Sequence, residues 1–121
     1  MGDRVKFQVV GSDGEFSPVI YGHWSGDTAP KVCKAIKDRM IGRLGDVQYT
    51  AARLVQELVG DAKGNTGFGI WNADAVLTED DSDGDAGVIL VHVAEGKAMR
   101  FECFGGYLSS DGGVPKTTEA A

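Results

Sequence analysis

The stretch VILVHVA, residues 88–94, is an almost continuous apolar run that only His92 interrupts. A strand with one exposed face alternates apolar and polar residues, whereas a strand buried on both faces is apolar throughout. We therefore expect a central strand here, and the neighbouring elements should pack around it.

Four further segments have the composition and periodicity of strands. AMRFECF (98–104) follows the central run after a short turn, and RVKFQVV (4–10) alternates cleanly between apolar and polar side chains. GSDGE (11–15) is typical of a turn, so FSPVIYGHW (16–24) should form a hairpin with the first strand. NTGFGIWN (65–72) is expected to be another strand.

Two helices are expected between the predicted strands at residues 16–24 and 65–72. Asp27 or Thr28 can cap the first, and Pro30 suits its first turn. Asp46 can cap the second, which should end at Gly60. The expected buried positions are Val32, Ile36, Met40 and Leu44 in the first helix, and Tyr49, Ala52, Val55 and Val59 in the second.

The order ββααβββ predicts an α+β fold. We expect an antiparallel sheet of about five strands with two helices packed on one face. Residues 1–104 should form a single domain, and residues 105–121, rich in Gly, Ser and Thr, a flexible tail.

Composition excludes several classes of function. The net charge of −6 argues against a general nucleic-acid surface and against binding to anionic membranes. No run approaches the roughly 18 apolar residues of a membrane span, and no secretory leader is recognisable at the start. Two cysteines without further signature fit reduced thiols, so a cytoplasmic location is expected.

YGHWSGD, residues 21–27, is the densest patch of side-chain chemistry. Strand alternation places Tyr21 and His23 on one face and Trp24 on the other. The helix N-terminus that follows, with Asp27 and Lys31, is a candidate anion site. Such a set could stack a ring and hold a phosphate. The alternative is that the aromatic residues are structural and His23 is simply hydrogen-bonded.

KGNTGFG, residues 63–69, contains glycines but lacks the Gly-Lys-Ser/Thr ending of a P-loop. Gly67 and Gly69 leave one face of the third strand without side chains, which gives room for a ligand or another backbone. Thr66 and Phe68 occupy the other face. A bulge or close packing would explain the same glycines.

The remaining chemistry gives no catalytic or metal site. EDDSDGDAG (79–87) departs from a calcium loop at its first and closing positions, so a solvated acidic loop is expected. Cys33 and Cys103 lack a nucleophile signature, and His23 and His92 lack metal-ligand spacing. We expect no cofactor, no metal and no catalytic residue, although the sequence does not decide whether the protein is an enzyme.

Two motifs resemble those of a family of small phage- and prophage-encoded proteins. They are Tyr-x-His-Trp-x-Gly and Thr-Gly-x-Gly-Ile, and the likeness covers about residues 4–72. The matching positions are Tyr21, His23, Trp24 and Gly26, and then Thr66, Gly67, Gly69 and Ile70. The resemblance implies a phage context and no particular activity. The acidic segment after Trp71 and the C-terminal residues do not match the family.

Site chemistry and phage context together suggest an anti-defence protein. The leading hypothesis is a homo-oligomer that binds and sequesters a nucleotide-derived immune messenger in the host cytoplasm. One alternative is a protein inhibitor whose acidic loop, residues 79–85, mimics nucleic acid. Another is a small phosphodiesterase that depends on His23.

Overall fold

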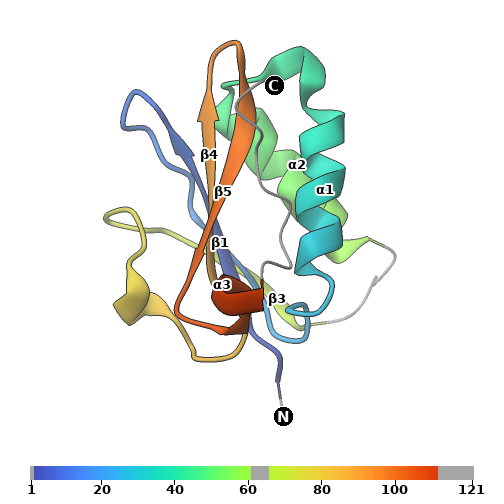
Figure 1. The fold of residues 1–121 in the computed structure, drawn as a ribbon, viewed down its shortest axis with the longest axis vertical. Coiled ribbons are helices and arrows are strands. Elements are labelled where there is room, and N and C mark those ends of the chain that lie inside the picture. Colours follow the sequence, from blue (N-terminus) through green and yellow to red (C-terminus); the bar gives the residue numbers. More distant parts are fainter. Residues whose placement is uncertain (1, 61–65, 112–121) are drawn as a thin grey trace.

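A computed structural model describes residues 2–60 and 66–111 of the chain. Within them, five strands form one sheet, and two helices cover one of its faces (Figure 1). The strands are β1 (Val5–Gly11), β2 (Val19–Gly22), β3 (Phe68–Trp71), β4 (Gly87–Ala94) and β5 (Lys97–Phe104). The helices are α1 (Ala29–Arg39), α2 (Val47–Val59) and the short α3 (Tyr107–Asp111), with 3-10 turns η1 (Ile41–Arg43) and η2 (Glu79–Asp81).

The strand order is β3-β2-β1-β4-β5. The predicted α+β class, with helices on one face, is confirmed, but the sheet is mixed rather than antiparallel. β1 and β4 run parallel, with Phe7 opposite Ile89, and the other three neighbouring pairs are antiparallel. β3 also runs in the direction of β4, and residues 72–86 are the crossover that joins these two strands past β2 and β1. We call residues 72–86 the crossover segment.

β4 lies between β1 and β5, as its apolar sequence predicts. Ile89 and Val91 face the helices and belong to the main core. Val88 and Leu90, which alternation places on the other face, are also buried. The crossover segment lies on that second face, and its η2 turn contacts β4 (Figure 1). Both faces of the central strand are therefore covered.

Gln8 fixes the crossover segment to β1. Its side chain is completely buried, and its Nε2 donates to the carbonyl oxygens of Ser17 at 3.1 Å and Ala75 at 3.3 Å. The Gln8 Oε1 accepts from the N–H of Leu77 at 2.8 Å. One amide thus satisfies main-chain groups from two separate segments.

The helices differ from the sequence prediction in detail. α1 ends at Arg39, so Leu44 lies outside it. In α2, Asp46 accepts from the N–H of Tyr49 at 3.0 Å and Gly60 ends the helix, as predicted. The predicted buried face of α2 is wrong at Tyr49 and Ala52, because the large leucines of the helix face the sheet, whereas Val55 packs partly against the core as predicted. The buried residues of α2 are Val47, Thr50, Leu54 and Leu58, whereas Tyr49 and Ala52 are exposed.

Residues 105–111 continue the domain instead of starting a flexible tail. Leu108 of α3 is buried in the main core, and the Tyr107 hydroxyl donates to Asp3 Oδ1 at 2.7 Å. Gly87 begins β4 with a φ of +100° and packs against the Phe104 carbonyl, where a side chain would not fit. The rest of the predicted tail, residues 112–121, is outside the described part of the chain.

None of the helices among the described residues combines the length and apolar character that crossing a bilayer requires.

Candidate ligand-binding site

Four aromatic rings follow one another at the end of the sheet where β1 begins. In order they are Trp71, Tyr21, His23 and Trp24, with successive ring centroids 5.4, 6.1 and 4.5 Å apart. We call these four residues the ring row. Both terminal indoles reach solvent, with Trp71 44% and Trp24 54% exposed. The row therefore offers flat apolar surface at each end.

The predicted proximity of Tyr21 and His23 is confirmed. The Tyr21 hydroxyl lies 2.7 Å from His23 Nδ1, and burial raises the pKa of Tyr21. The N–H of His23 donates to the Gly67 carbonyl at 2.8 Å, which continues the β2–β3 ladder. Trp24 does not occupy the opposite face, because β2 ends at Gly22 and strand alternation ends with it. Its ring instead meets that of His23 edge-on.

Gly69 lies opposite Tyr21 in the β2–β3 ladder. A Cβ at Gly69 would lie 3.3 Å from the Trp71 ring and 3.9 Å from the Tyr21 ring. The space left by the missing side chain is therefore filled by these rings and is not open to a ligand. Gly69 allows the indole of Trp71 to lean over the strand toward Tyr21.

Two cations that the sequence analysis did not assign to the site lie beside the ring row. Lys6 pairs with Tyr21 across the β1–β2 ladder, and its Nζ is 5.8 Å from the centre of the Trp71 ring. Arg4 lies two residues earlier on the same face of the chain. Alternation in RVKFQVV indicates this face, but only the pairing of β1 with β2 brings the cations to the rings.

The acidic part of the crossover segment already engages both cations. Lys6 Nζ lies 3.7 Å from Asp83 Oδ2 and donates to the Asp81 carbonyl at 2.7 Å. Arg4 Nε donates to Asp85 Oδ2 at 2.8 Å, and this bond lowers the pKa of Asp85. The prediction of a solvated acidic loop is therefore wrong for Asp83 and Asp85, because β1 presents cations to them.

A carboxylate of the chain lies beside the loop that leads into α1, next to the predicted anion site. Asp3 Oδ2 accepts from the N–H of Asp27 at 2.9 Å, two residues before α1 begins. Thr28 stands at the cap without a side-chain cap bond. Asp27 and Lys31 are exposed, and within the described residues the structure records no contact between Lys31 and the ring row.

The predicted site residues of the 63–69 stretch join those of the 21–27 stretch only in part. Gly67 and Gly69 lie with the ring row, whereas Phe68 points to the helix face of the sheet, where it packs against the main core. Thr66 is exposed. Strand alternation, which is readable in the sequence, separates Phe68 from the two glycines.

The other reactive side chains lie elsewhere. Cys33 is buried in the main core, and burial raises its pKa. Burial also raises the pKa of Cys103 to about 11, so both thiols stay protonated at neutral pH. His92 pairs with Val10 near the far end of β1, and its Nε2 lies 2.8 Å from Glu102 Oε1. Among the described residues no three His, Cys, Asp or Glu side chains form a group suited to a metal ion.

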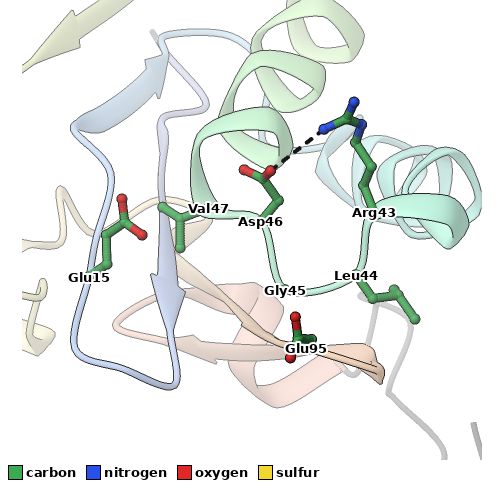
Figure 2. A pocket seen from close by; sticks show the side chains of 7 residues that line it. All are labelled: Glu15, Arg43, Leu44, Gly45, Asp46, Val47 and Glu95. Atoms are coloured by element: carbon green, nitrogen blue, oxygen red, sulfur yellow. Dashed lines mark ion pairs between the residues drawn. The ribbon is translucent and has the colours of Figure 1, made fainter.

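A separate pocket of about 380 Å³ lies at that far end, between the turns that join β1 to β2 and β4 to β5 (Figure 2). The one cation among its described lining residues, Arg43, lies 3.8 Å from Asp46 and stacks on the Tyr49 ring at 3.9 Å. Glu15 and Glu95 face the same space. The pocket contains none of the predicted site residues.

Comparisons of the chain with family models, with curated proteins and with solved structures find no match.

Proposed function

We propose that this protein is a non-enzymatic, phage-encoded anti-defence protein that sequesters a nucleotide-derived immune messenger in the cytoplasm of the host cell. One observation carries the proposal: the ring row ends in exposed indoles and has Lys6 and Arg4 at its side. Exposed aromatic rings next to cations suit a ligand that combines a base with phosphate. The phage context rests on the resemblance of the two motifs.

Binding would proceed by exchange of anions. The base stacks on Trp71 or Trp24, and the phosphate replaces Asp83 at Lys6. The ion pair between Lys6 and Asp83 is 3.7 Å long and partly exposed. Among the described residues it is the longest polar contact between the crossover segment and β1, and a surface ion pair of this kind contributes little to stability. Arg4 and Asp85 form the shorter pair and hold the segment in place.

Calorimetry against a panel of cyclic mono- and dinucleotides tests the proposal. Wild-type protein should release or absorb heat with at least one ligand, and Trp71→Ala and His23→Ala should each weaken that binding about tenfold or more, a loss of about 1.4 kcal/mol. His92→Ala is the matched control, because His92 lies at the other end of β1. Absence of heat with every ligand would refute the proposal.

Two further arms separate the alternatives. Asp83→Asn removes the charge that competes with phosphate for Lys6 and should tighten nucleotide binding several-fold. The nucleic-acid-mimic hypothesis instead expects the same change to weaken inhibition of the host protein. Ligand recovered after heat denaturation of the complex should be chemically intact. A converted product would favour the His23-dependent phosphodiesterase.

A further inference from the structure

The two edges of the sheet differ in their protection. β5 carries Lys97, Arg100 and Glu102 along its length, and charged side chains of this kind prevent pairing with other chains. β3 has the sequence FGIW, without charge or proline. Its Ile70 is 58% exposed, and Trp71 next to it also reaches solvent. β3 is thus an unprotected apolar edge.

An apolar groove of about 330 Å³ runs between β3 and α2. Val55 and Val59 of α2 form one wall, and Phe68 and Ile70 form the other. None of the described residues that line the groove is charged. A strand added beside β3 would place alternate side chains in this groove.

The main chain of β3 is oriented to accept another strand. The bond from His23 N–H to the Gly67 carbonyl identifies this pair as a hydrogen-bonded one. Since such pairs alternate along an antiparallel ladder, Phe68 and Ile70 direct their N–H and C=O groups away from β2. Among the described residues no strand lies on that outer side.

We propose that β3 pairs antiparallel with β3 of a second copy, about a two-fold axis at Gly69. Phe68 then exchanges main-chain hydrogen bonds with the partner's Ile70, and their side chains form a cross-strand pair over the groove. On the other face, Trp71 lies opposite the partner's Gly67, where no side chain obstructs the indole. If the register shifted by one residue, the N–H and C=O groups that point outward from one β3 strand would face residues of the other strand whose N–H and C=O groups point toward β2, so these hydrogen bonds could not form.

Charge favours a second copy as the partner. In a two-fold interface a patch meets itself, so it must be neutral or self-complementary. The chain carries a net charge of −6, yet β3 and the described lining of the groove carry none. A stable dimer buries about 800 Å² per partner, more than a four-residue strand supplies, and the half-buried Val55 and Val59 extend the apolar surface.

Sedimentation equilibrium of the ligand-free protein tests the proposal. The wild type should be a dimer, and Ile70→Lys, which puts a charge on the edge, should be a monomer. Ile41→Lys is the matched control, because Ile41 is 71% exposed but lies in η1. Circular dichroism verifies that each variant is folded. A monomeric wild type at about 1 mM, or a dimeric Ile70→Lys, would overturn the proposal. Since no ligand is present, the result is independent of nucleotide binding.

Disulfide trapping tests the register. Phe68→Cys and Ile70→Cys proteins are mixed and oxidised, and a cross-linked heterodimer is expected on a non-reducing gel. Wild-type protein on the same gel controls for Cys33 and Cys103. A cross-linked homodimer of Ile70→Cys in preference to the heterodimer would refute the two-fold axis at Gly69.

Discussion

Gln8 is a polar residue that the fold depends on, although it lies in a strand between apolar neighbours. Its amide bonds to Ser17, Ala75 and Leu77 without access to water. Replacing it by leucine leaves the buried Ser17 carbonyl unpaired, which costs about 1–3 kcal/mol. The two part-buried bonds, to Ala75 and Leu77, are also lost, at about 0.5 kcal/mol each. We expect Gln8→Leu to lower the free energy of unfolding by roughly 2–4 kcal/mol in urea titrations.

The matched control for Gln8 is Gln56→Leu. Gln56 is exposed on α2, so the same substitution there should change stability by less than about 0.5 kcal/mol. Equal losses for the two variants would show that the Gln8 side chain does not anchor the crossover segment.

Single residues also show what the sequence can and cannot reveal about the site. Alternation predicts that Tyr21 and His23 share a face, because the rule holds inside a strand. It fails for Trp24, which lies beyond the end of β2. It also gives no sign that Asp3, remote in sequence, binds the loop before α1. Contacts between distant segments depend on the tertiary fold, which local patterns do not encode.

At the scale of elements, the strands were predictable and the pairing of β1 with β4 was not. The apolar run of β4 indicates burial on both faces, but its direction relative to β1 depends on the path of the crossover segment. The face of α2 was predicted wrongly for a related reason. Apolar residues cover a wide arc of this helix, and only packing decides that Leu54 and Leu58 face the sheet while Val55 lines the groove.

The attachment of the crossover segment to β1 should depend on pH. The bond from Arg4 lowers the pKa of Asp85, so the charged carboxylate stabilises the fold above the ordinary aspartate pKa of about 4. This contribution is lost as the pH falls through the lowered pKa. We expect the stability of Asp85→Asn to vary less with pH below about 4 than that of the wild type, measured by urea unfolding.

Asp80→Asn is the control for this pH effect. Asp80 is exposed in η2, and removing its charge should leave the acid dependence of the wild type. If Asp85→Asn and the wild type lose stability in parallel as the pH falls, the bond between Arg4 and Asp85 does not link pH to folding.

At the scale of the whole molecule, the two ends of the described chain meet. Tyr107 of α3 donates to Asp3, and the other oxygen of Asp3 accepts from the loop before α1. The composition of residues 105–121 suggests a tail, because glycine and serine are common in disordered segments. Leu108 in that segment is nevertheless buried in the main core, and the N–H of Tyr107 donates to the Asp85 carbonyl at 3.0 Å.

The contact between the two ends should make the fold sensitive to alkaline pH. Partial burial, the hydrogen bond to Asp3 and nearby carboxylates raise the pKa of Tyr107 to about 12, whereas an unfolded tyrosine titrates near 10. Between these values the folded state keeps a proton that the unfolded state has lost, so stability falls as the pH rises.

Tyr107→Phe cannot titrate and should lose less stability over this range, although it starts lower at neutral pH by about 1 kcal/mol for the missing hydrogen bond. Guanidinium unfolding at about pH 8 and about pH 11 measures both effects. Tyr49→Phe, which removes an exposed hydroxyl from α2, is the control and should retain the steeper dependence. Equal pH dependence of the wild type and Tyr107→Phe would contradict the raised pKa of Tyr107.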